Sequence, residues 1–220
     1  MSRSSLHAAL WPLLPENTHA YVTELLAAHP VDVRLSRPRR TKLGDHRAPT
    51  ALRRRHRVTV NNDLNPYAFL TTLLHEIAHA ATWERHRTRI RRVRPHGPEW
   101  KSEFERIFTP VVAGRMLPED VNAALGRAMR NPAAATCSDR DLMLALARYD
   151  AVEQGRVFVE SLPAGTIFRT DGGRTFRMGP RLRSRYRCIE HATGREYRLH
   201  PLCRVEPVAD EDAWRPGTHR

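Results

Sequence analysis

The segment 66–84 constrains the fold of this chain more than any other, because it is the most apolar stretch and yet carries titratable side chains in its middle. Asn65 suits a helix N-cap, and Pro66 suits the first helical position, where a missing N–H costs nothing. Helices that are apolar on nearly every side are usually buried. We therefore expect a buried helix over 66–84, whose polar side chains need partners inside the protein.

The titratable residues of this helix form the run His75-Glu76-Ile77-Ala78-His79. Residues four apart lie on one helix face, so the imidazoles of His75 and His79 can reach a single tetrahedral zinc ion. Glu76 lies beside them and can take a proton from water at the metal. The competing interpretation is a pair of inert core histidines held by hydrogen bonds. We predict one Zn²⁺ ion bound by His75 and His79, with Glu76 as the catalytic base.

A catalytic zinc needs a third protein ligand and an open position. His96 precedes Gly97-Pro98, a turn followed by a helix start, and such a turn can aim a side chain back toward the first two ligands. The alternatives are Glu99, Glu103 and His86. We predict His96 as the third ligand. The oxyanion-stabilising residue stays open, with the two tyrosines Tyr67 and Tyr149 and an arginine of 85–94 as candidates.

The charge of the chain is strongly positive, with 37 Lys and Arg against 24 Asp and Glu and a net charge of +13. A surface this basic attracts polyanions, although an arginine-rich composition alone would raise the charge of any protein. No acidic residue occurs from 85 to 98. We predict that the arginines of this run bind DNA or RNA beside the metal: Arg85, Arg87, Arg89, Arg91, Arg92 and Arg94.

Around the metal segment the sequence predicts an α+β protein. Helices are expected over 17–28, 98–108, 118–129 and 139–151, the last capped by Ser138, and strands over 31–35 and 56–61. After Gly155 the pattern changes to short strands at 157–161, 165–169, 174–178, 185–190, 196–199 and 203–205, in which Phe168 and Phe176 are expected to form a core. We expect a metallopeptidase domain over 1–152, with 131–136 as a linker, a small antiparallel β unit over 153–208, and a disordered tail over 209–220.

The three cysteines Cys137, Cys188 and Cys203 show no paired spacing, which argues against a disulfide framework and favours a reducing, cytoplasmic location. Cys188 and Cys203 are expected to pack inside the β unit. No segment is long and apolar enough to span a membrane, so no membrane partner is expected.

HEIAHA followed by HGPEWKSEF resembles the SprT-like metallopeptidases, the group that includes Spartan, the DNA-dependent protease of eukaryotes. The run 41–47 looks like the strand that precedes the motif in that family, and 58–61 resembles a second segment of it. The resemblance implies His75, His79 and His96 as zinc ligands and Glu76 as general base. Many family members end in a four-cysteine zinc ribbon. This chain lacks the CxxC pairs, so no second zinc is carried over.

The resemblance thus implies a zincin-like core, with a short sheet and an HExxH helix, that works as a zinc metalloendopeptidase. Its expected partners are a protein substrate and nucleic acid, in a role such as repair of DNA–protein crosslinks, and the expected state is a monomer. Two alternatives remain open. One is a nucleic-acid-binding adaptor with a structural zinc, and the other is a zinc hydrolase of a non-peptide amide.

Overall fold

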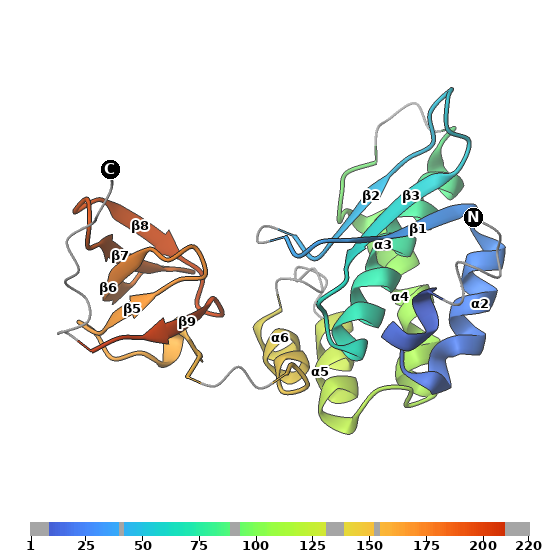
Figure 1. The fold of residues 1–220 in the computed structure, drawn as a ribbon. Helices are drawn as coiled ribbons and strands as arrows, with labels where there is room; N and C mark the ends of the chain where they lie inside the picture. Colours follow the sequence, from blue (N-terminus) through green and yellow to red (C-terminus); the bar gives the residue numbers. More distant parts are fainter. Residues whose placement is uncertain (1–8, 40–41, 89–92, 131–138, 152–154, 210–220) are drawn as a thin grey trace. The chain divides into compact units, whose positions relative to one another are not determined.

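In the computed structural model, the residues described are 9–39, 42–88, 93–130, 139–151 and 155–209. The chain divides into two compact units, Met1–Ala151 and Val152–Arg220, which are described separately here (Figure 1). The expected linker 131–136, together with Cys137 and Ser138, lies outside the described residues, and so does the expected tail from residue 210 onward. The mixed α+β class expected from the sequence is confirmed.

The sheet of the first unit has three strands in the order β1-β3-β2. β1 (Val31–Ser36) pairs in parallel with β3 (His56–Asn61), and β2 (Gly44–Arg47) pairs with β3 in the antiparallel direction. β2 is therefore an edge strand. β3 is the central strand, and its apolar residues Val58 and Val60 are fully buried, as a central β-branched strand requires.

Helix α3 (Pro66–His86) is the centre of this unit and contacts the sheet as well as α4 and α6 (Figure 1). Its N-cap is Asn65, whose side-chain oxygen accepts hydrogen bonds from the backbone N–H groups of Tyr67 and Ala68, at 3.1 and 2.9 Å. The amide of Asn65 also donates to the backbone oxygen of Leu146, 2.9 Å away, which ties the start of α3 to α6. The predicted buried helix and its cap are confirmed, with two more residues at the C-terminal end.

The remaining helices are α2 (His19–Ala28), α4 (Pro98–Ala113), α5 (Glu119–Arg130) and α6 (Arg140–Ala147). The expected end of α4 at Phe108 is wrong, because the helix continues past Pro110 and buries Val111 completely. α6 ends earlier than expected, and its cap is Asp139, whose carboxylate accepts from the N–H of Leu142 at 2.9 Å, rather than Ser138. Within the described ranges, no helix has the length and apolar character that crossing a membrane requires.

The second unit is an antiparallel sheet in the order β4-β9-β5-β6-β7-β8. Its strands are β4 (Val157–Phe158), β5 (Ile167–Arg169), β6 (Thr175–Arg181), β7 (Tyr186–Glu190), β8 (Glu196–Leu199) and β9 (Arg204–Pro207). The expected strand 157–161 is only half right, because Val159–Ser161 form a 3-10 turn. Phe168, Phe176 and Cys188 lie in a buried core against which Cys203 packs, so the packing predicted for these residues is confirmed.

Candidate metal centre

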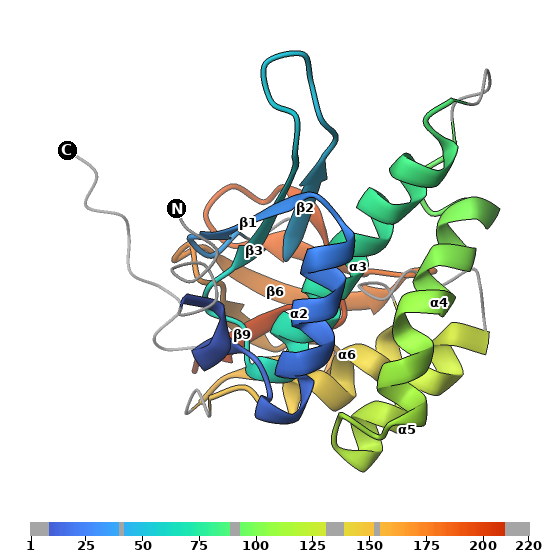
Figure 2. The ribbon, with the colours of Figure 1, turned by 90° about the vertical axis from the view of Figure 1, so that its right-hand side faces the viewer.

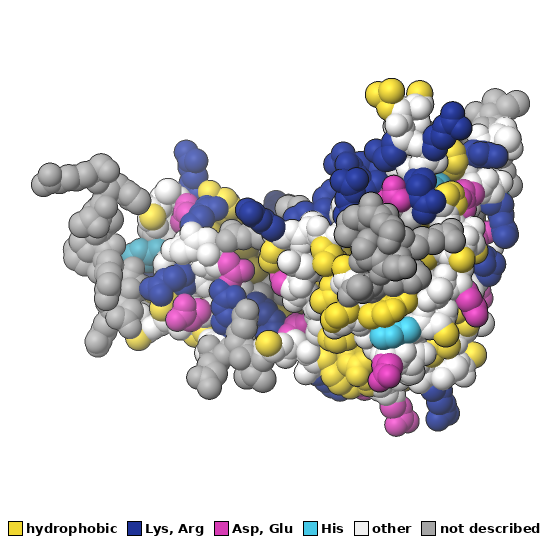
Figure 3. Space-filling model, turned by 45° about the vertical axis from the view of Figure 1, so that its right-hand side comes forward, with side chains coloured by type: hydrophobic (Ala, Val, Ile, Leu, Met, Phe, Trp, Pro, Cys, Tyr) yellow, Lys and Arg dark blue, Asp and Glu magenta, His cyan; other side chains and the backbone are white. Residues whose placement is uncertain are grey.

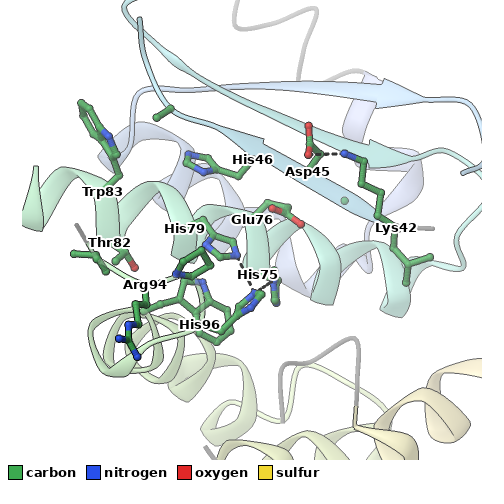
Figure 4. Close-up of a pocket in the computed structure, with 16 residues that line it drawn as sticks. Lys42, Asp45, His46, His75, Glu76, His79, Thr82, Trp83, Arg94 and His96 are labelled. Atoms are coloured by element: carbon green, nitrogen blue, oxygen red, sulfur yellow. Dashed lines mark hydrogen bonds and ion pairs between the residues drawn. The ribbon is translucent and has the colours of Figure 1, made fainter. Parts of the chain in front are cut away.

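The imidazoles of His75, His79 and His96 meet in one cleft of the first unit (Figure 4). His75 and His79 come from consecutive turns of α3, and His96 comes from the turn before α4. The Nε2 atom of His96 lies 3.2 Å from Nε2 of His75 and 3.2 Å from Nε2 of His79. Two nitrogen ligands about 2.05 Å from a tetrahedral zinc lie about 3.3 Å apart, so the donor set fits this metal.

The neutral form of these imidazoles is favoured, most strongly at His75 and His79, since His96 is the exposed member of the three. Burial lowers the pKa of His75 to about 3, with a smaller contribution from His96. The pKa of His79 falls to about 2, first through burial and then through the two other histidines, and burial also lowers the pKa of His96. A neutral imidazole has the free lone pair that metal ligation requires. The cluster therefore favours binding of a metal cation over protonation of its imidazoles.

The backbone of His96 adopts a left-handed conformation, with φ of 57°. The next residue closes a turn, because the N–H of Gly97 donates to the carbonyl oxygen of Arg94 at 3.0 Å. Pro98 then starts α4 with its fixed φ. A non-glycine residue with positive φ is uncommon and is held only by its surroundings, which here aim the ring of His96 back toward α3.

The other three candidates for the third ligand, namely His86, Glu99 and Glu103, are not part of this cluster. The structure groups His96 with the two helical histidines, and it is the only such group of ligating side chains among the described residues. Glu103 is buried in α4 and forms ion pairs with Arg85 and Arg106, at 2.9 and 2.8 Å. The carboxylate of Glu103 thus links α4 to the C-terminal end of α3 through its ion pair with Arg85.

Glu76 lies in the same cleft and is 7% exposed. Burial raises the pKa of its carboxyl to about 7, and the nearby carboxylate of Asp45 adds to this. Gly44 of β2 makes room for this side chain, since a Cβ atom at position 44 would lie 2.5 Å from Oε1 of Glu76 and 2.8 Å from the methyl group of Thr72. The edge strand therefore fixes where the carboxylate sits, and a raised pKa suits a group that exchanges protons near neutral pH.

Trp100 of α4 forms one wall behind the imidazoles and is 3% exposed. The centroid of its ring system lies 4.8, 5.2 and 4.7 Å from those of His75, His79 and His96. Its indole N–H has no hydrogen-bond partner among the described residues. Trp100 thus restricts the rotation of all three rings by packing.

His46 of β2 forms another wall, with its ring stacked on His79 at 5.9 Å between centroids. Nε2 of His46 lies 2.8 Å from Nδ1 of the fully buried His56, and Nε2 of His56 lies 3.8 Å from the carboxylate of Glu84. The other oxygen of Glu84 lies 2.6 Å from Nδ1 of His29. Burial lowers the pKa of both His46 and His56 to about 4. No local sequence pattern indicates this chain of contacts, because its members come from four separate segments.

The cleft has a volume of about 630 Å³ and is lined by 42–46, by α3 and by 93–96. Among the oxyanion candidates, Tyr67 and Tyr149 do not line it. Their rings pack against each other, 4.7 Å apart, and the hydroxyl of Tyr149 donates to Asp120. Arg94 does line the cleft (Figure 4).

The predicted basic run has a mixed outcome. Arg85 is engaged with Glu103, while the guanidinium of Arg87 lies 6.0 Å from the ring centroid of Trp83. Arg94 is among the residues that line the cleft, and Arg89, Arg91 and Arg92 lie outside the described residues. Binding of nucleic acid by this run stays a prediction.

Comparison with known proteins adds one finding. Residues 14–121 match the SprT-like family, and this span contains the whole histidine cluster, Glu76 and the edge strand β2. Neither the curated proteins nor the solved structures gave a significant match to the chain. Residues 14–121, just under half of the chain, are therefore similar to the SprT-like family, the same family that the motifs resemble.

Proposed function

We propose that the first unit has a zincin-like core and works as a zinc-dependent metalloendopeptidase that cleaves proteins associated with nucleic acid. The observation that carries this proposal is the convergence of three neutral Nε2 atoms beside a buried carboxylate with a raised pKa. Three protein ligands leave a position for water, as in catalytic zinc sites, whereas structural sites usually have four protein ligands. The match of residues 14–121 to the SprT-like family supports the same chemistry.

His75, His79 and His96 would hold the zinc ion. When bound, zinc polarises the scissile carbonyl and lowers the pKa of water at the site. Glu76 takes the proton of the attacking water on a carboxylate oxygen and then passes it to the nitrogen of the leaving amine. Arg94 and His46 line the cleft and are placed to hydrogen-bond the substrate.

The association with nucleic acid rests on charge. The chain has a net charge of +13, and Arg94 is among the residues that line the cleft. Phosphate contacts made by such a surface concentrate the enzyme where basic, DNA-associated proteins occur. The family resemblance to Spartan points to the same class of substrate.

The test is a digestion assay with a basic DNA-binding protein, with and without duplex DNA, together with the zinc content of the purified chain. We expect one zinc per chain, cleavage that a chelator stops, and loss of both zinc and cleavage in His96→Ala. His86→Ala is the matched control, because His86 lies outside the cluster and should keep both. A chain that cleaves fully without metal, or a His96→Ala variant that retains its zinc, would refute the proposal.

A further inference from the structure

The connection between β2 and β3 is a projecting hairpin whose tip carries a completely exposed leucine. Thr50 and Arg53 pair across the hairpin, with N–H to O distances of 2.8 and 3.1 Å, and leave a two-residue turn of Ala51 and Leu52. Leu52 is 101% exposed, more than any other large apolar residue in the described part of the chain. Figure 2 shows the hairpin extending well beyond the sheet and helices of its own unit.

This tip is held in place by several contacts. The guanidinium of Arg53 donates to the carbonyl oxygens of Arg55 and Ala48, at 3.1 and 2.5 Å, which clamps the two sides of the hairpin together. Arg55 in turn pairs with Asp32 of β1 at 2.6 Å. Because the turn is ordered before any partner arrives, little conformational entropy remains to be lost when Leu52 is buried by that partner.

The chain segment around the leucine is basic in sequence, although Arg47 and Arg55 are paired with Asp45 and Asp32. From 46 to 62 the chain has five arginines and no acidic residue. Arg54 is exposed next to Leu52, and no described carboxylate pairs with it. In Figure 3 the corresponding upper end of this unit shows hydrophobic side chains with Lys and Arg side chains close by. An apolar tip beside an exposed cation complements a partner that is anionic outside and apolar within.

We propose that this hairpin, residues 47–55, binds duplex DNA, with Leu52 wedged against a base step and Arg54 on the phosphates. A duplex combines stacked bases with flanking phosphates, and apolar wedges such as leucine are a known way to enter a base step from the groove. The proposal rests on the proposed function for its choice of polyanion. It also deepens that function, because Ala48 at the base of the hairpin lines the cleft. DNA bound there lies beside the site of cleavage.

The test compares duplex DNA affinities by fluorescence anisotropy at several salt concentrations, using the full chain. Leu52→Ser should weaken binding about tenfold, the loss expected for one buried leucine side chain, without changing the salt dependence. Arg54→Ser should weaken binding and reduce the slope of log K against log salt by about one, because one phosphate contact is lost. A duplex containing 2-aminopurine should become brighter with saturating wild type and stay dim with saturating Leu52→Ser, because only the wedge unstacks bases.

The controls are Leu35→Ser and Arg127→Ser. Leu35 is also exposed, at 41%, but lies in β1, and Arg127 is exposed in α5 at the opposite end of the unit from the hairpin (Figure 1, Figure 2). Both controls should bind DNA like the wild type. All variants should keep their zinc and their DNA-independent cleavage, since none contacts the cluster.

Three outcomes would overturn the hairpin proposal. The first is wild-type affinity in both Leu52→Ser and Arg54→Ser. The second is that Leu52→Ser abolishes binding to vesicles of phosphatidylcholine and phosphatidylserine but leaves DNA binding intact, which would assign the tip to a membrane. The third is that it abolishes only self-association in sedimentation velocity. If the wild type itself showed no salt-sensitive DNA binding, the nucleic-acid part of the proposed function would fail together with the hairpin.

Discussion

Each of the two units buries a glutamate that is 7% exposed, but the two carboxylates have opposite surroundings. Glu190 of the β unit is paired, since Arg174 donates to it at 2.5 Å and Thr193 also bonds it. The hydrogen bond from Arg174, followed by that from Thr193, holds the pKa of Glu190 below its usual range. Glu76 of the first unit has no ion-pair partner among the described side chains, and burial raises its pKa to about 7.

The same contrast extends to the other buried side chains of the two units. Among the described residues of the β unit, the buried ones are apolar apart from the satisfied Glu190. In the first unit the core also contains His56, His75 and Glu76, whose burial disfavours their charged forms. Strongly perturbed pKa values gather at functional sites, so the contrast supports the chemical role proposed for the first unit.

The largest expected effect comes from neutralising the two glutamates in turn. Glu76→Gln should lower kcat on the order of 10³-fold while zinc content stays at the wild-type level, because an amide cannot accept the proton. Glu190→Gln should leave kcat unchanged and lower only the thermal stability of the β unit. Steady-state cleavage, metal analysis and thermal melts check both variants. An active Glu76→Gln would remove the contrast between the two units.

The second prediction concerns the independence of the two cores. Phe168 is fully buried in the β unit, and Phe168→Ala should lower the free energy of unfolding of that unit by about 3–5 kcal/mol without changing cleavage of a protein substrate. The matched variant is Phe69→Ala in α3, equally buried, which should reduce zinc binding and cleavage together. Differential scanning calorimetry with parallel activity assays measures both effects. Equal loss of activity in the two variants would show that the units work as one.

The smallest of these effects, and the one most specific to the position of Glu76, is expected at Gly44. In Gly44→Ala the new methyl group would displace the carboxylate of Glu76, and kcat should fall about 10²-fold with KM and zinc content unchanged. Gly126→Ala is the control, because its Cβ would meet only Val112 at an ordinary 3.7 Å and would favour helix α5. A fall in zinc content that accompanied the fall in kcat would mean that Gly44 acts on the fold and not on Glu76.

Much of the fold could be predicted because its signals are local. Asn65-Pro66 and the apolar run after it define α3, and alternation defines β1 and β3. α4 ended too early in the prediction, because Pro110 normally stops a helix, whereas here the burial of Val111 outweighs that preference. The tip of the β2–β3 hairpin was not predicted, although a strand was expected over 56–61 and 41–47 resembled one. The segment 48–55 has no apolar alternation, and its turn is closed by one pair of backbone hydrogen bonds and by the side chain of Arg53.

The candidate site likewise contains residues that local patterns predict and residues that they do not. His75 and His79 are brought together by helical spacing, and the turn at Gly97-Pro98 made His96 a reasonable third member. The contacts of Gly44 with Glu76 and of His46 with His79 join β2 to α3 and depend on strand register, which local patterns do not encode. The same limitation made Arg85 look available for nucleic acid, although it is engaged by Glu103 from the next helix.

The left-handed backbone of His96 has a consequence for anyone who would engineer this protein. Glycine and asparagine are the residues that relax such a conformation, and neither offers an imidazole nitrogen. Substitutions chosen to ease the turn would therefore erase a metal ligand. Position 96 is a point where thermostability screens and activity screens should select opposite sequences.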